Sequence, residues 1–153
     1  MSEPPADAAH DALAPPVRAL FGALDHAGDP AAECAGRWLS GQAGSEQHGT
    51  RVRFALCILG PCHAGAGAYR VIQARYRAYG CPYTLAACEW VARQLQDCEL
   101  AALSALALAQ ALGGPLQWAE SLAVPPERLG RLLVIEDALR AALVTAAADG
   151  DGV

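Results

Sequence analysis

The segment Leu100–Leu112 is the feature that most constrains how this chain can fold, because a helix built from it is apolar on nearly every side. Such a helix needs cover all round, either at the centre of a helical bundle or at an interface between subunits. The chain as a whole has 35 alanines and 20 leucines but only 9 aromatic residues, a composition typical of closely packed helices. We therefore predict an all-α fold, a compact bundle of about six helices.

The length of 153 residues is that of a single domain. We predict a disordered arm over residues 1–14, one all-α domain over 15–148 and a frayed tail over 149–153. The arm lacks the apolar stretch of a signal peptide, and the run 100–112 is too short to cross a bilayer. We therefore expect a cytoplasmic protein that does not enter a membrane.

Apolar residues at helical spacing, bounded by prolines and glycines, predict the individual helices. Their approximate ranges are 16–27, 30–41, 66–79, 84–112, 115–122 and 125–148. The segment 51–59 is ambiguous, because apolar residues alternate there as in a strand while Thr50 could cap a helix. No second convincing strand is present to pair with it, so we favour a helix and leave the strand open.

The charges are unevenly distributed along the chain. The net charge of −5 argues against binding to nucleic acid or membranes through bulk electrostatics, yet residues 49–88 hold five arginines and no carboxylate. In the predicted helix 66–79, Arg70, Gln73 and Arg77 share one face. That face could contact phosphates, meet an acidic protein or simply be solvated.

The segment Leu116–Leu132 consists of two short amphipathic pieces that meet at a Val-Pro-Pro corner. Its apolar positions match those that a helix-turn-helix needs for packing; they are Trp118, Ala119, Leu122, Leu129 and Leu132. The pattern resembles helix-turn-helix DNA-binding regulators, and residues 116–148 resemble region 4 of sigma factors.

This resemblance implies a helix-turn-helix corner near residues 116–132 in which Arg128 and Arg131 face DNA. The chain departs from the family at Ala123, where a glycine is usual. It also departs at Glu127, which is placed to pair with Arg131 and so to offset its attraction for phosphate.

Two functions follow from these patterns. The first is a small regulatory protein that binds DNA or acts with the transcription machinery, using the corner and the basic helix. The alternative is a helical interaction module, such as an antiactivator, an adaptor or an immunity-type protein. It would form a homodimer or hold a protein partner through Leu100, Leu103 and Leu106. We expect no enzyme activity and no cofactor.

The six cysteines are expected to be reduced and partly buried, because the chain shows no secretion signal. A zinc site was considered for Cys57, Cys62, His63, Cys81 and Cys88, but their spacing contains no CxxC pair. Cys62 lies in a glycine-rich segment before a predicted helix, where it could act as a nucleophile. The more economical interpretation is a tight turn with a small thiol, so we predict no metal and no catalytic residue.

Overall fold

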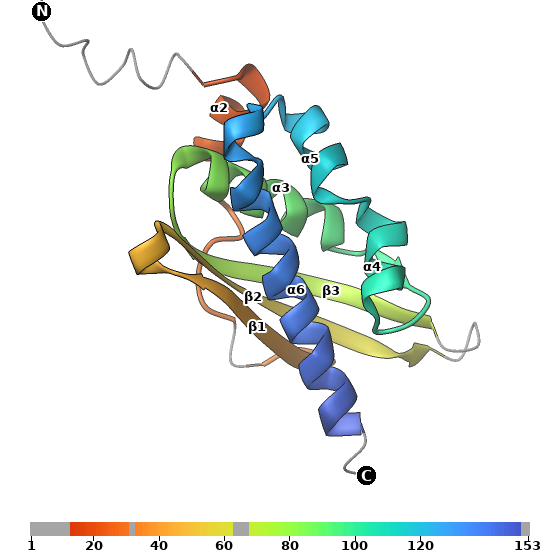
Figure 1. The fold of residues 1–153 in the computed structure, drawn as a ribbon. Helices are drawn as coiled ribbons and strands as arrows, with labels where there is room; N and C mark the ends of the chain where they lie inside the picture. Colours follow the sequence, from red (N-terminus) through yellow and green to blue (C-terminus); the bar gives the residue numbers. More distant parts are fainter. Residues whose placement is uncertain (1–12, 31–32, 63–67, 151–153) are drawn as a thin grey trace, which may run out of the picture.

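The chain forms an α/β fold in which helices cover one face of a four-stranded antiparallel sheet with the strand order β1-β2-β3-β4 (Figure 1). The computed structural model describes residues 13–30, 33–62 and 68–150. The elements are α2 (Pro15–Phe21), β1 (Arg37–Ser45), η1 (Glu46–His48), β2 (Thr50–Cys62), β3 (Ala68–Tyr79), α3 (Pro82–Leu95), β4 (Glu99–Leu100), α4 (Ala105–Leu112), α5 (Pro115–Leu122), η2 (Pro126–Arg128) and α6 (Leu129–Gly150).

The all-α prediction is therefore wrong. The segment 51–59 is part of strand β2, which pairs with β1 and β3. The residues of β1 had been predicted as the end of a helix and a loop, and those of β3 as a helix. In β3 the inward residues Ala74, Tyr76 and Ala78 alternate with polar outward residues. Small alanines on the buried face weaken this alternation, and the tyrosines of the segment also recur at helical spacing, which explains the error.

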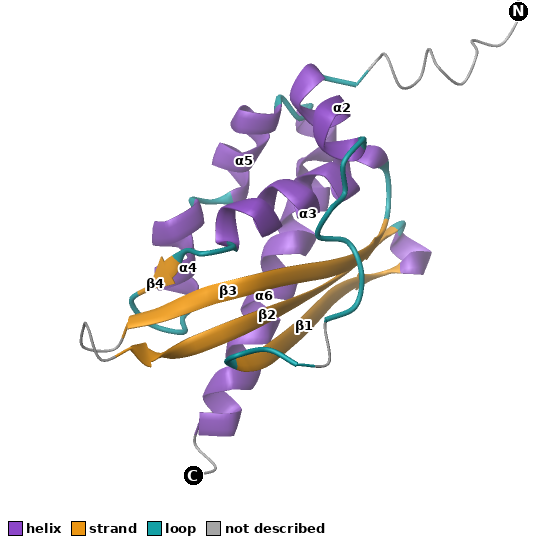
Figure 2. Cartoon of the chain, turned by 180° about the vertical axis from the view of Figure 1, so that it is seen from behind, coloured by secondary structure: helices purple, strands orange, loops and turns teal. Residues whose placement is uncertain are grey.

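The inner face of the sheet packs against α6 and α3. Its apolar side chains form the core together with residues of α6; examples are Leu39, Val52, Phe54, Leu56, Val71, Leu132, Ile135 and Leu139. Gly41 lets α6 approach β1, since a Cβ atom there would overlap the backbone of Ala138 and Ala142. The outer face carries no helix in the described part of the chain, as Figure 2 shows from behind.

The predicted helix 84–112 is in fact two helices separated by a short strand. The chain leaves α3 through Asp97, whose φ of 66° is left-handed, and its N–H donates to the carbonyl of Val71. β4 then pairs with β3. The three leucines predicted to form an interface therefore lie in different environments. Leu100 is 1% exposed, Leu103 is partly buried against the core and Leu106 is 70% exposed. They do not form one apolar surface.

The corner predicted near residues 116–132 is present as a bend between α5 and α6. Ala123 adopts a left-handed conformation with a φ of 53° where the resemblance would place glycine. The second helix, however, lies against the sheet, with α6 making most of its contacts to β1 and β2. The corner is thus part of an α/β core and not a unit whose second helix stands free to enter a DNA groove.

A buried carboxylate ties α3 to the segment before β1. Glu89 is fully buried and accepts hydrogen bonds from the backbone N–H of His26 (2.9 Å), the Tyr76 hydroxyl (3.1 Å) and Arg93 Nε (2.8 Å). Its second oxygen also lies 2.6 Å from Nδ1 of His26. Burial alone would raise the pKa of Glu89, but these hydrogen bonds and the charge of His26 hold it below its usual value.

The prediction that all cysteines are reduced is also wrong, because Cys34 and Cys57 form a disulfide. The two are 23 residues apart in sequence, and the bond attaches the segment before β1 to the outer face of β2. None of the described helices is long and apolar enough to cross a membrane. The predicted arm and tail lie mostly outside the described residues.

Candidate functional site

Three connections meet at one end of the sheet (Figure 1). The β1–β2 hairpin closes there, since Ser45 pairs with Thr50, and β3 ends beside it, since Arg51 pairs with Tyr79. The start of α6 joins them through a hydrogen bond of 2.8 Å from Arg131 Nη1 to Thr50 Oγ1. We call this place the thiol end and define it by Cys81, His48, Thr50, Arg128 and Arg131.

Cys81 is the N-cap residue of α3 and is followed by Pro82 at the first helical position. Its Sγ lies 3.6 Å from the Thr84 hydroxyl. Partial burial acts to raise the pKa of the Cys81 thiol, but hydrogen bonds from the side chain and backbone of Thr84 and the backbone of Tyr83, with the charge of Arg128, outweigh it. The pKa is held below its usual value, as expected for a thiol at a helix N-terminus beside a cation.

The other free cysteines in the described part of the chain have the opposite character. Cys88 is fully buried, and burial raises its pKa. Cys98 is half-buried like Cys81, yet burial raises its pKa as well because no hydrogen bond or cation compensates. Among these three thiols, Cys81 is therefore the one whose surroundings favour the thiolate.

His48 closes the β1–β2 hairpin at the same end of the sheet as Cys81. Its Nδ1 lies 2.6 Å from Ser45 Oγ, which also accepts a hydrogen bond from the His48 backbone N–H at 3.3 Å. Both bonds hold the ring at the hairpin, so that Nε2 is the nitrogen available to a ligand. Gly49 follows with a φ of 81°, a conformation that favours glycine.

The sequence placed Arg128 and Arg131 on a DNA-reading helix. In the structure, Arg131 binds the Thr50 hydroxyl, which is 2% exposed, and Arg128 acts on the electrostatics of Cys81. Both arginines, which the sequence suggests as DNA contacts, thus lie at the thiol end.

The remaining DNA-contact candidates lie on strand β3 and not on a helix. Arg77 makes an ion pair of 2.6 Å with Asp29, and Arg70 one of 3.5 Å with Asp97 at the opposite end of β3. The side-chain oxygen of Gln73 is buried without a hydrogen-bond partner. Strand alternation places Gln73 and Arg77 on the outer sheet face. Arg70 is separated from them by a register shift between Cys57 and Ile58, so the three residues do not follow simple alternation.

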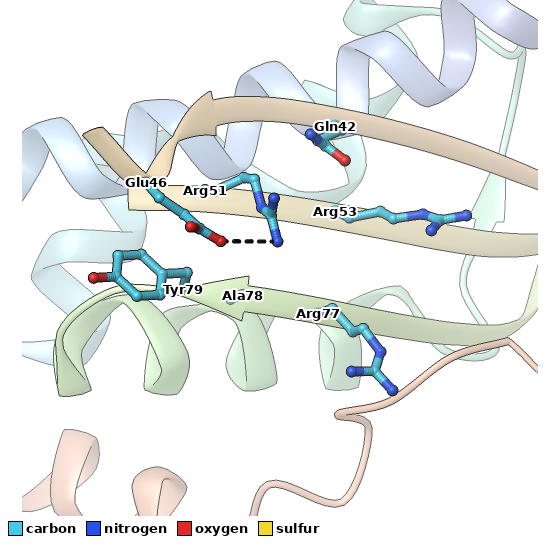
Figure 3. Close-up of a pocket in the computed structure, with 7 residues that line it drawn as sticks. All are labelled: Gln42, Glu46, Arg51, Arg53, Arg77, Ala78 and Tyr79. Atoms are coloured by element: carbon cyan, nitrogen blue, oxygen red, sulfur yellow. Dashed lines mark ion pairs between the residues drawn. The ribbon is translucent and has the colours of Figure 1, made fainter. Parts of the chain in front are cut away.

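A hollow of about 330 Å³ lies on this outer face. Figure 3 shows the residues that line it. It is lined by Gln42, Glu46, Arg51, Arg53, Arg77, Ala78 and Tyr79. Glu46 and Tyr79 connect it to the thiol end, because Glu46 belongs to the same short helix as His48 and Tyr79 precedes Cys81 by two residues. The sequence analysis noted the arginines, but only the strand pairing shows that they are neighbours.

The site residues missed from sequence are Cys81 as a reactive thiol and His48. Cys81 had been considered only as a zinc ligand, although Pro82 directly after it and Thr84 three residues after it are typical of a helix start. That pattern could have revealed the thiol at a helix N-terminus. The nucleophile proposed at Cys62 stays a prediction, because its side chain and His63 lie outside the described residues.

The thiol end does not have the ligands to hold a metal cluster by itself. The described residues contain no group of three or more His, Cys, Asp or Glu side chains that could hold a metal ion. The thiol end contains one thiol, one imidazole and two guanidinium groups, those of Cys81, His48, Arg128 and Arg131. This set suits the chemistry of a single thiolate.

No protein-family model matches the chain, and no curated protein matches it. Among solved structures, it is similar to a protein of Fervidobacterium islandicum AW-1 described as an iron–sulfur cluster assembly scaffold for the SUF system. The TM-score is 0.55 at 12% sequence identity, and the match covers 88% of this chain and 98% of that one. At this identity the likeness shows the fold.

This likeness overturns the expected function as well as the expected fold. The chain has an α/β architecture, which it shares with that structure, and not the architecture of a helical DNA-binding regulator. The prediction of DNA as a partner is wrong for the same reason. The alternative of a helical module that uses the 100–112 segment also fails, because that segment is not one helix and its leucines do not share a surface.

Proposed function

We propose that this chain takes part in iron–sulfur cluster assembly by carrying a sulfur atom on Cys81. The observation that carries the proposal is the place of Cys81 at the N-terminus of α3, half-buried and with its Sγ 3.6 Å from the Thr84 hydroxyl, an arrangement that lowers the pKa of the thiol. The likeness in fold to an iron–sulfur cluster assembly scaffold supports the process in which the thiol would act. The small number of ligands at the thiol end favours a carrier of sulfur over a holder of a complete cluster.

The chemistry needs a thiolate and a persulfide donor. The Cys81 thiolate attacks the outer sulfur of the donor, a new S–S bond forms at Cys81, and the donor's S–S bond breaks to release its thiolate. Cys81 then bears the persulfide. The step transfers one sulfur between thiols, so it needs no external oxidant or reductant.

The neighbouring residues have separate roles in this proposal. Thr84 donates to the sulfur and Arg128 places positive charge near it, so both favour the thiolate over the thiol. Arg131 donates a hydrogen bond to Thr50 at the end of the β1–β2 hairpin, where its positive charge can stabilise the departing thiolate. These are positioning and electrostatic roles, and the reacting atom is Cys81 Sγ.

A carrier of this kind fits the cytoplasmic location that the sequence analysis expected, because the cytoplasm keeps reactive thiols reduced. The Cys34–Cys57 disulfide would be unusual there. Cys57 is fully buried but Cys34 is only partly buried, so a small thiol reductant can still open the bond by exchange at Cys34.

The test incubates the full chain with a synthetic peptide persulfide and maps by mass spectrometry which cysteine gains one sulfur atom. We expect the sulfur on Cys81 in the wild type, none there in Cys81→Ser, and an unchanged result in the matched control Cys98→Ser. Thr84→Val should slow the transfer at pH 7 and move the pH–rate profile to higher pH, since it removes a hydrogen bond that favours the thiolate.

Two results would overturn the proposal. One is sulfur that appears on Cys98 as readily as on Cys81, because the lowered pKa would then have no consequence. The other is a stable cluster with visible absorbance when the chain is supplied with iron and sulfide and remains monomeric. In that case the chain would hold a cluster with ligands that the thiol end does not provide.

A further inference from the structure

The outer face of the sheet carries a concentration of positive charge that the core does not require. Arg51, Arg53, Arg75 and Arg77 lie on this face, which we call the arginine face. The strand register places them together, since Arg53 pairs with Arg77 and Arg51 with Tyr79 at the end of the sheet. The whole chain has a net charge of −5, so these arginines form a local patch of opposite sign.

Only part of this charge is balanced within the described residues. Arg51 pairs with Glu46 at 3.3 Å and Arg77 with Asp29 at 2.6 Å, both among exposed side chains. Arg75 donates to a backbone carbonyl at residue 25. Arg53 is exposed at the centre of the face and makes no ion pair with any described residue. It is the position where an external carboxylate would gain most.

The shape of the face favours a protein partner over a small anion. Figure 3 shows that the guanidinium groups diverge: Arg53 extends along its strand, Arg51 points to Glu46 and Arg77 points away from the hollow. A phosphate-sized ligand needs donors that converge on one point. Neighbouring strands are about 4.8 Å apart and alternate residues about 6.7 Å. Several carboxylates of one acidic segment can match this spread.

The arginine face also continues into the thiol end. Glu46 and Tyr79, which line its hollow, lie within two residues of His48 and Cys81. We propose that the arginine face docks an acidic protein segment that brings the sulfur donor to Cys81, an inference that rests on the proposed function. Docking there holds the donor beside the thiolate and raises its local concentration.

The experiment compares two synthetic peptide persulfides that differ only in a run of glutamates or of glutamines. Each donor is mixed at low salt with the wild type, Arg53→Glu and the control Arg140→Glu. Arg140 is an exposed arginine on α6, away from the arginine face, so it matches the charge change. The readout is the ratio of the sulfur-transfer rates to Cys81 from the two donors.

We expect the wild type to react about tenfold faster with the glutamate donor, and this preference to disappear at high salt. The preference should persist in Arg140→Glu and be lost or reversed in Arg53→Glu. Equal rates from both donors in the wild type would overturn the docking proposal and leave the sulfur-carrier function standing. If millimolar inorganic phosphate by itself abolishes the preference for the glutamate donor, the docking proposal is also overturned, because the arginine face would then be a small-anion site.

A failure of the proposed function gives a different result. If neither donor transfers sulfur, Cys81 is not a sulfur acceptor, and docking is then decided by the fluorescence anisotropy of labelled polyglutamate. Binding by the wild type that Arg53→Glu weakens at least tenfold would support docking. Tighter binding of a single-stranded DNA oligonucleotide of equal charge would overturn an acidic protein as the partner.

Discussion

Glu89 offers a sharp test of the reasoning about buried charge in this fold. Its carboxylate accepts hydrogen bonds from His26, Tyr76 and Arg93, and it is fully buried in the middle of α3. Glu89→Gln preserves the shape of the side chain but replaces one oxygen with an NH₂ group. The donors that faced this oxygen then meet another donor, and the charge of Arg93 loses its buried partner.

We expect this substitution to lower the free energy of unfolding by about 3 kcal/mol, near the lower end for breaking a buried ion pair, because Arg93 is partly exposed. For a chain of this length that corresponds to roughly 6–12 °C in Tm. The matched control is Glu136→Gln, whose i,i+4 partner Arg140 is 3.4 Å away at the surface. The control should cost about 0.3 kcal/mol. Urea unfolding at pH 7 measures both.

The pH dependence gives a second check. The pKa of Glu89 is lower in the folded protein than in the unfolded chain. The ionised carboxylate therefore contributes fully to the free energy of unfolding above the unfolded pKa of about 4.3, and this contribution is lost as the pH falls through the folded-state pKa. The difference in the free energy of unfolding between the wild type and Glu89→Gln should therefore shrink as the pH is lowered below about 4. Equal costs for the two substitutions, or a difference that grows on acidification, would refute the reasoning.

Two further predictions concern packing and covalent links. Gly41→Ala should lower the free energy of unfolding by about 3 kcal/mol or more, because its Cβ would overlap the backbone of Ala138. Gly114→Ala meets no atom within 4 Å and should lower it by about 1 kcal/mol or less, the cost of replacing glycine at a helix N-cap; urea unfolding compares the two. Cys34→Ser should lower the free energy of unfolding by about 3 kcal/mol, because it removes the disulfide to Cys57. This difference from the wild type should vanish when both proteins are unfolded in the presence of dithiothreitol. A wild type whose stability does not change with reductant would contradict the prediction.

Local sequence signals predicted the parts of the chain whose structure depends on near neighbours. α5 occupies the predicted range, because glycines and a proline mark its start. The bend at Ala123 and the long helix after it also follow from the sequence. In each of these places the turn residues and the apolar spacing indicate the same conformation.

The sheet could not be recognised in this way. The segment 51–59 showed a strand pattern, but a strand is stable only with partners, and β1 and β3 carry small or evenly spaced residues that resemble helix. Once the partners are misassigned, the remaining strand looks unpaired and is assigned to helix. The error in one element therefore became an error in fold class.

The sequence by itself determined the helical C-terminal half and the local basic segment 49–88. Only the tertiary structure decided that Cys81, His48 and Arg131 share one end of a sheet, that Cys34 bonds to Cys57 and that the arginines form one face. These relations join residues that are tens of positions apart. They depend on strand register and on helix packing, which no local pattern of residues encodes.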